Sequence, residues 1–157
     1  MRRFILVAAF ALAACGPSQP SSSSAPTQTN LAPAPSSAEM QAKVAALPAP
    51  YNAANYEAGR TVFAQCRSCH TIDPSEANRI GPHLHGVIGR HAGSVQGFAY
   101  SPAMQSQTYT WDTAHLDHYL ENPAAAVPNN RMGFAGVRDA TQRRDLIAFI
   151  QVESAQP

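Results

Sequence analysis

The stretch CRSCH, at residues 66–70, limits what this chain can fold into more than any other part of the sequence. Cys66 and Cys69 are three positions apart, and His70 follows the second cysteine directly. Such a pattern is found in redox-active dithiols, in halves of zinc sites and at points where haem is attached covalently. Each of these chemistries makes a different demand on the rest of the chain.

Two of the three chemistries are poorly supported by the remaining residues. A structural zinc site takes four ligands, which often come from two cysteine pairs. The only other cysteine is Cys15, close to the start of the chain, so the sequence has no second pair. A redox dithiol of the thioredoxin type is expected within alternating strands and helices, and the sequence shows no such pattern.

Covalent attachment of haem fits the spacing best. Two thiols must reach the two vinyl groups on one edge of the porphyrin, and residues three apart on one helical turn face the same side. The following His70 can then turn its imidazole toward the iron. We therefore predict one haem c, bound through Cys66 and Cys69, with His70 as an iron ligand.

The occupant of the sixth iron position decides what such a haem can do. A methionine thioether is a soft, neutral ligand that closes the site and favours the reduced iron, so that only single electrons pass. An open or labile position would instead permit peroxide or gas chemistry. By residue type alone the candidates are Met104, Met132, His83, His85, His91, His115 and His118.

Residues 1–14 are predicted to be a lipoprotein signal peptide. Two arginines precede an apolar run that is too short to span a bilayer as a mature helix. The sequence LAAC at 12–15 resembles the lipobox of bacterial lipoproteins, which implies cleavage before Cys15 and lipidation of that cysteine. A plain signal peptide cut at the same place is the alternative, and a buried core helix is the less favoured one.

Residues 15–54 are predicted to be a lipidated N-terminus and a disordered tether. They hold seven of the thirteen prolines and a run of four serines, with few large apolar residues to offset the entropy of ordering. The stretch 38–47 could form a marginal helix, to which we assign no function. The resemblance to lipoproteins implies a position on the periplasmic side of a bacterial membrane, with the cytoplasmic membrane favoured.

Residues 55–157 have the composition of a folded domain, with aromatic and branched apolar side chains among glycines. The apolar pattern predicts helices over 55–66, 111–122 and 141–152, and a glycine-rich loop over 81–97. So little regular structure in about a hundred residues leaves a thin core, which a bound haem would complete. A formal net charge of +1, with 13% charged residues, disfavours a nucleic-acid binder.

A series of motifs after CRSCH resembles one family. In order along the chain they are GPHLHGVIGR, GFAYS, TWD, YLENP, NRMGFAGV and RDLIAFI. Together they are similar to the class I cytochromes c of the mitochondrial and bacterial c2 kind, over residues 55–151. The resemblance implies a small all-α cytochrome c fold, in which three main helices and glycine-rich loops wrap around one covalently bound haem. It also implies that Met132, and not Met104, is the sixth ligand.

The resemblance assigns further residues to the haem. The Pro82 carbonyl would accept the ring N–H of His70, and the Tyr119 hydroxyl would reach the sulfur of Met132. Five more positions match residues around the haem: Arg90, Tyr100 and Trp111 at the inner propionate, Asn130 near the propionates and Phe134 at the exposed haem edge. Four others match the crossing of the first and last helices: Gly59, Phe63, Leu146 and Phe149.

The chain departs from the family in its surface charge. The mitochondrial proteins surround the haem edge with lysines, whereas this chain has one lysine, Lys43, within the predicted tether. The sequence AAAV at 124–127 stands where the family commonly shows lysines. We therefore expect weak long-range electrostatic steering and docking through apolar contacts.

The function implied by the resemblance is that of a single-haem electron carrier and not an enzyme. Such a carrier shuttles one electron between membrane complexes of a respiratory or photosynthetic chain, with a quinol-oxidising complex as donor and a terminal oxidase or reductase as acceptor. We expect a monomer. The alternative is a haem enzyme or sensor, peroxidase-like or gas-binding, in which the methionine ligand is labile.

Overall fold

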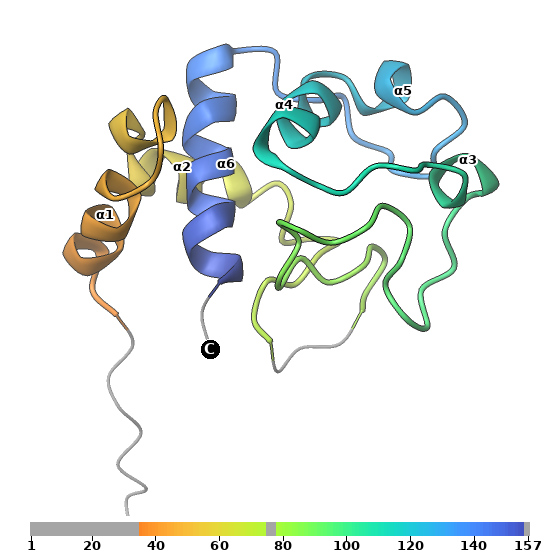
Figure 1. Cartoon of the computed structure of the whole chain (residues 1–157), viewed down its shortest axis with the longest axis horizontal. Helices are drawn as coiled ribbons and strands as arrows, with labels where there is room; N and C mark the ends of the chain where they lie inside the picture. The colour runs from red at the N-terminus through yellow and green to blue at the C-terminus, as the bar shows by residue number, and fades with distance from the viewer. Residues whose placement is uncertain (1–34, 75–77, 156–157) are drawn as a thin grey trace, which may run out of the picture. The chain divides into compact units, whose positions relative to one another are not determined.

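The computed structural model describes residues 35–74 and 78–155, and all of the regular secondary structure in these ranges is helical (Figure 1). In chain order the elements are α1 (Ser37–Ala45), the 3-10 helix η1 (Tyr51–Ala53), α2 (Tyr56–Phe63), α3 (Pro102–Gln105), α4 (Thr113–Glu121), α5 (Pro123–Ala126) and α6 (Ala140–Ser154). The predicted all-α class is confirmed. None of the helices in these ranges is long and apolar enough to cross a membrane.

The three predicted helices correspond to α2, α4 and α6, and each begins at a side-chain cap. Asn55, Asp112 and Asp139 occupy the N-cap positions, where each side chain accepts a backbone N–H from the first turn. Helix α4 ends at Glu121, shortly before Pro123, because proline cannot continue a helix that precedes it. The stop expected at Pro123 is confirmed for α4, whereas α2 ends at Phe63, three residues before the predicted end.

Helices α2 and α6 cross in close contact. A Cβ atom added at Gly59 would lie 2.2 Å from the Asp145 carbonyl oxygen and 2.7 Å from Cβ of Phe149, so only glycine permits this approach. The rings of Phe63 and Phe149 pack with their centroids 5.0 Å apart. Leu146, also on α6, is fully buried. The crossing that the resemblance implies is present in the structure.

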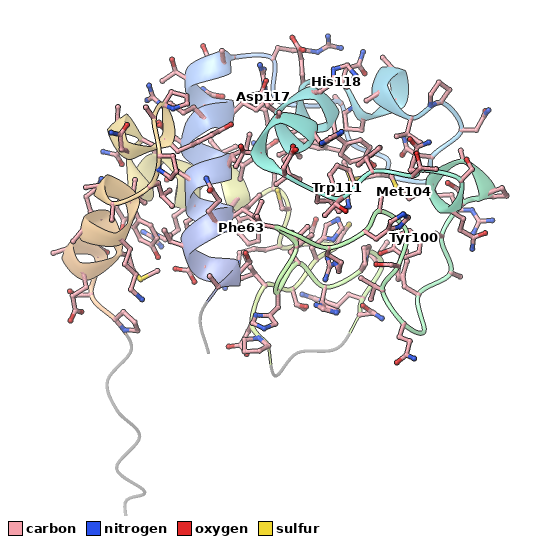
Figure 2. The ribbon with its side chains drawn as sticks, viewed as in Figure 1. Phe63, Tyr100, Met104, Trp111, Asp117 and His118 are labelled. Carbon is pink, nitrogen blue, oxygen red and sulfur yellow. The ribbon has the colours of Figure 1, made fainter. Side chains whose placement is uncertain are left out.

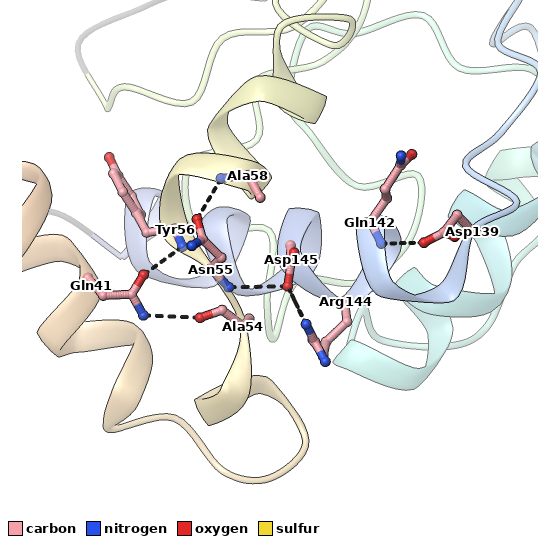
Figure 3. A network of polar contacts seen from close by, with 9 residues as sticks. All are labelled: Gln41, Ala54, Asn55, Tyr56, Ala58, Asp139, Gln142, Arg144 and Asp145. Carbon is pink, nitrogen blue, oxygen red and sulfur yellow. Dashed lines mark hydrogen bonds and ion pairs between the residues drawn. The ribbon is translucent and has the colours of Figure 1, made fainter.

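A polar network joins the start of α2 to both α6 and α1 (Figure 3). The buried carboxylate of Asp145 accepts the backbone N–H of Asn55 at 3.2 Å. The Gln41 side chain reaches across from α1, donating to the Ala54 carbonyl at 3.0 Å and accepting the Tyr56 N–H at 2.8 Å. The N–H groups of Asn55 and Tyr56 lie at the start of α2, where they have no hydrogen-bond partner within the helix. Because Asp145 and Gln41 supply those partners, they fix where α2 begins.

The structure corrects the predicted boundary of the domain. The prediction of a disordered tether over 15–54 is wrong for residues 35–54, which form α1, η1 and their connections. Met40 and Val44 of α1 are 2% and 0% exposed, and they belong to the same core cluster as the residues of α2 and α6. An isolated helix of this length is weak in water, but burial of one apolar face against folded partners stabilises it.

The other N-terminal predictions concern residues 1–34, which lie outside the described residues. They are the signal peptide over 1–14, the lipidation of Cys15 and the remaining part of the tether. Within the described part, α1 and η1 lie on one side of α6, and α3, α4 and α5 lie on the other (Figure 1). The loops between α2 and α4 lie on this second side too (Figure 1), and they carry most of the residues predicted to contact the cofactor.

Backbone pairing holds two of these loop segments together. The Trp111 N–H donates to the Arg90 carbonyl at 2.8 Å, and the Gly89 N–H donates to the Trp111 carbonyl at 2.8 Å. An isolated antiparallel bridge joins His91 to Thr110 at the same place. The pairing therefore sets two of the predicted cofactor residues, Arg90 and Trp111, beside each other.

Candidate cofactor site

A cavity of about 510 Å³ lies among the loops, α3 and α4. This volume is within the range of small-molecule and cofactor sites. The described residues that line it include no aspartate, glutamate or lysine. All eleven residues predicted to contact the cofactor line this one cavity: Cys66, Cys69, His70, Pro82, Arg90, Tyr100, Trp111, Tyr119, Asn130, Met132 and Phe134. A second hollow of about 570 Å³, over Asp117 and Arg143, contains none of them.

The two thiols are presented by the turns that follow α2. That helix ends earlier than predicted, at Phe63, and residues 64–69 form turns. The N–H groups of Cys69 and His70 both donate to the Cys66 carbonyl, at 3.0 and 2.9 Å, which brings the two cysteines to the same side of a turn. Before haem is attached, burial, with a smaller contribution from Cys69, raises the pKa of the free Cys66 thiol to about 11.

The imidazole of His70 is oriented by the Pro82 carbonyl, whose oxygen lies 2.7 Å from Nδ1. Because a carbonyl can only accept, Nδ1 carries the proton and Nε2 keeps a lone pair for a metal. Burial lowers the pKa of His70, the Pro82 bond opposes this, and the positive charge of Arg90 lowers the pKa further. The neutral imidazole, which is the form that binds iron, is therefore favoured.

Gly81 leaves room for the His70 ring, a role that sequence reasoning missed. A Cβ atom at this position would lie 2.3 Å from Cε1 and 2.7 Å from Nδ1 of His70. The Gly81 N–H also donates to the Cys69 carbonyl at 2.8 Å, so the segment lies directly against the CRSCH turns. The available signal was the glycine immediately before Pro82, at a point where a side chain would push the ring away.

Met132 is anchored by the asparagine two residues before it. The Oδ1 of Asn130 accepts the Met132 N–H at 2.7 Å, while its amide nitrogen donates to the carbonyls of Pro123 and Val127 at 2.7 and 2.8 Å. Both amide N–H groups are thus engaged by the backbone. A contact with the haem propionates, as predicted for Asn130, would have to break one of these bonds. Anchoring of the methionine is the role that the geometry supports.

The sulfur of Met132 meets the hydroxyl of Tyr119, which donates to it at 3.8 Å. This is the contact that the resemblance implies. Burial raises the pKa of Tyr119, so the hydroxyl keeps its proton and remains a donor. The ring of Tyr119 is in turn held edge-on by Trp111, with centroids 5.1 Å apart. Met132 is therefore held at its backbone N–H by Asn130 and at its sulfur by Tyr119.

The three residues predicted at the inner propionate lie together in the cavity wall. Two nitrogens of the Arg90 guanidinium donate to the carbonyls of His85 and His83, at 3.0 and 2.8 Å, which fixes the orientation of its remaining N–H groups. Tyr100 and Trp111 share the wall with Arg90, and Figure 2 shows these two side chains near α3 and α4. The half-buried guanidinium supplies a positive charge that a buried carboxylate requires.

A second thioether lines the same cavity. Met104, on α3, is 7% exposed and lines the cavity together with Tyr100; both are labelled in Figure 2. Placement in the cavity therefore does not separate Met104 from Met132 as an iron ligand. The hydrogen bonds do favour one of them, because the Asn130 anchor and the Tyr119 contact both belong to Met132.

The donor set fits a haem c. Two neighbouring thiols match the two covalent attachments, and an imidazole with a free Nε2 and an oriented thioether match the two axial positions of the iron. The aliphatic and aromatic walls match the porphyrin face, and Arg90 matches a propionate. Every group that haem c requires from a protein is present among the residues that line this cavity.

Comparisons with known proteins agree with this assignment. The family model for cytochrome c matches residues 56–152. Cytochrome c2 of Blastochloris viridis is 43% identical over 108 residues, which cover 69% of this chain and 85% of that protein. Cytochrome c 2.1 of Caenorhabditis elegans is 47% identical over 105 residues, which cover 66% of this chain and 94% of that protein.

A solved structure shows the same relationship in three dimensions. Cytochrome cH from Methylobacterium extorquens is similar with a TM-score of 0.57 and 38% sequence identity, covering 61% of this chain and 96% of that chain. The matched region 56–152 is more than half of the chain and contains every residue of the cavity lining, whereas α1 and η1 precede it. The chain belongs to the cytochrome c family.

Proposed function

We propose that this protein shuttles single electrons between membrane complexes of a respiratory or photosynthetic chain, using one haem whose iron is bound by His70 and Met132. Membership of the cytochrome c family establishes the coarser part of this statement: the protein carries haem c on Cys66 and Cys69 and transfers electrons, and it is not an enzyme. The bound haem supplies one-electron chemistry at its iron. A quinol-oxidising complex as donor and a terminal oxidase or reductase as acceptor are the proposed partners.

One observation carries the proposal, namely that the chain offers a prepared side chain for each axial position. Nδ1 of His70 is committed to the Pro82 carbonyl, which leaves Nε2 for the iron. Met132 is restrained by Asn130 and Tyr119, so these contacts define the position of its sulfur without help from the haem iron. Two protein ligands leave no site for an outside molecule, and this favours an electron carrier over a haem enzyme or gas sensor.

Carbon monoxide tests this proposal directly. The reduced holoprotein is expected not to bind carbon monoxide on a timescale of minutes, because the methionine occupies the sixth position. The oxidised form is expected to show the weak red absorption band of a methionine–iron bond. Rapid carbon monoxide binding, or absence of that band in the wild type, would favour the enzyme or sensor.

The mouth of the cavity supports docking through apolar contacts. Ile80 lines the cavity and yet is 80% exposed, and the half-buried Phe134 lines the cavity as well. Two exposed arginines lie close to them in the chain, Arg79 directly before Ile80 and Arg131 three residues before Phe134, in place of a ring of lysines. A partner that presents an apolar patch with few charged side chains fits this surface.

Weak electrostatic steering predicts a shallow salt dependence. The rate of electron transfer to a partner complex is expected to fall less than about threefold between roughly 0.05 and 0.5 M salt, because few charges are screened. Ile80→Ser should slow association several-fold without changing the absorption spectrum. The matched control is Ile88→Ser, since Ile88 is 37% exposed and does not line the cavity. A steep fall with salt, or equal effects of the two variants, would argue against apolar docking.

The proposed anchor rests on the N-terminal sequence. Removal of residues 1–14 and lipidation of Cys15 would hold the protein on the periplasmic side of the cytoplasmic membrane. Because α1 begins at Ser37, a tether before it would have only about 20 residues and a root-mean-square reach of roughly 22–27 Å. Mass spectrometry of the mature protein should find acyl groups on Cys15; an unmodified cysteine would rule the anchor out.

A further inference from the structure

The segment that carries Met132 has no secondary structure of its own, so the contacts at its two ends decide where the methionine lies. Residues 130–139 form neither helix nor strand. The asparagine anchor described above holds the upstream end. At the downstream end, the Val137 N–H donates to the Leu120 carbonyl at 2.8 Å. The downstream end is therefore attached to α4, the helix that also carries Tyr119.

A buried arginine forms hydrogen bonds with the same downstream end. Arg143, in the first turn of α6, is 6% exposed. Its Nη1 donates to the carbonyls of Val137 and Arg138, at 2.9 and 3.3 Å. Its Nε and Nη2 donate to the two carboxylate oxygens of Asp117 on α4, at 2.7 and 3.3 Å. One side chain thus ties α6, α4 and the end of the segment together through all three of its nitrogens.

The segment also passes α4 at very close range. A Cβ atom at Gly136 would lie 2.2 Å from the Glu121 carbonyl oxygen, and Gly136 has a φ of 93°, which favours glycine. Close packing of this kind does not allow gradual sliding, so the segment moves away from α4 only when its attachments open. The number and strength of those attachments then set how often it moves.

We propose that Arg143 is a positioning residue for the sixth iron ligand. By holding the Val137 and Arg138 carbonyls against α4, Arg143 keeps the Met132 sulfur beside Tyr119 and limits how often the methionine leaves the iron. Arg143 does not line the cavity, so it acts through the residues between Met132 and Val137. The inference rests on the proposed ligation of iron by Met132.

Three variants weaken the hydrogen bonds of Arg143 in different ways. Arg143→Lys keeps the positive charge, but an ammonium group cannot replace the planar fork that reaches Asp117 and two carbonyls together. Arg143→Met removes the charge and keeps a side chain of similar length. Asp117→Asn leaves Arg143 in place and removes the charge of its partner, whose side chain is 41% exposed. The matched control is Arg144→Met, because Arg144 is adjacent on α6 and pairs with Asp145 instead of the segment.

Imidazole, which displaces a methionine ligand from iron, is the probe for all of these holoproteins. The Arg143 variants are expected to bind imidazole about tenfold more tightly than the wild type, because charged hydrogen bonds of this kind restrain the methionine. Arg144→Met should match the wild type. Amide hydrogen exchange provides a second readout: it should accelerate about tenfold at Met132, Phe134 and Val137 and remain unchanged over residues 146–150.

Two results would overturn the inference alone. One is equal imidazole affinity in the Arg143 and Arg144 variants; the other is uniform acceleration of exchange through α6, which would mean a merely structural role. If Arg143→Met does not fold, the imidazole affinity and the hydrogen exchange of Arg143→Lys and Asp117→Asn decide, each compared with Arg144→Met. Absence of a methionine–iron band in the wild type would instead overturn the proposed function, and this inference with it.

Discussion

Replacing Met132 with alanine is expected to lower the midpoint potential of the haem by about 0.1–0.3 V and to let the reduced protein bind carbon monoxide. A thioether stabilises the reduced iron, so its loss favours the oxidised state. Alanine has no group that can replace the sulfur, and the sixth position then takes water or an added ligand. Redox titration and carbon monoxide difference spectra of the holoprotein measure the two effects.

Met104→Leu is the control for this experiment, because Met104 is the other thioether in the cavity. Leucine has nearly the same volume and lacks only the sulfur, so the methionine–iron band and the resistance to carbon monoxide should persist. If Met104→Leu abolished the band and Met132→Ala preserved it, the ligand assignment would be reversed. If neither variant changed the spectrum, no methionine would be bound to the iron.

Gly59→Ala is expected to lower the free energy of unfolding by roughly 3 kcal/mol or more. In an exposed helix the same change would stabilise by up to about 1 kcal/mol, because alanine is the better helix former. Here the added Cβ would lie 2.2 Å from the Asp145 carbonyl oxygen, which is backbone and cannot rotate away. Helices α2 and α6 would have to separate, and the packing of Phe63 on Phe149 would weaken with them.

The sign of this effect separates tertiary packing from helix propensity. Thermal and denaturant unfolding of the holoprotein measure it, with Arg60→Ala as the control on the exposed side of the same helix. Arg60 takes part in a surface ion pair with Glu57, so its removal should change stability by less than about 0.5 kcal/mol. A neutral or stabilising Gly59→Ala would show that the helices do not approach as closely as described.

The residues that contact the cofactor are predictable because chemistry restricts their types and spacing. The CRSCH motif specifies two thiols and an imidazole within five positions. The later motifs identify by their spacing which residues line the rest of the cavity. All eleven predicted residues line one cavity. Residues that act on backbone atoms are harder to find. Asn130 and Arg143 bind backbone groups, which carry no side-chain signature in the sequence, so Asn130 was predicted at the propionates and not as the anchor of Met132. Gly81 acts by having no side chain against the His70 ring.

The amino-acid sequence by itself determined the attachment motif, the helices at α2, α4 and α6 and membership of the cytochrome c family. Spacing, caps and ligand chemistry act within a few residues of the chain, so a linear reading detects them. Only the tertiary structure decided that residues 35–54 belong to the folded domain and which groups hold Met132 in place. Those outcomes depend on burial and on hydrogen bonds between residues far apart in the chain, which stabilise a helix or a loop that is weak when considered alone.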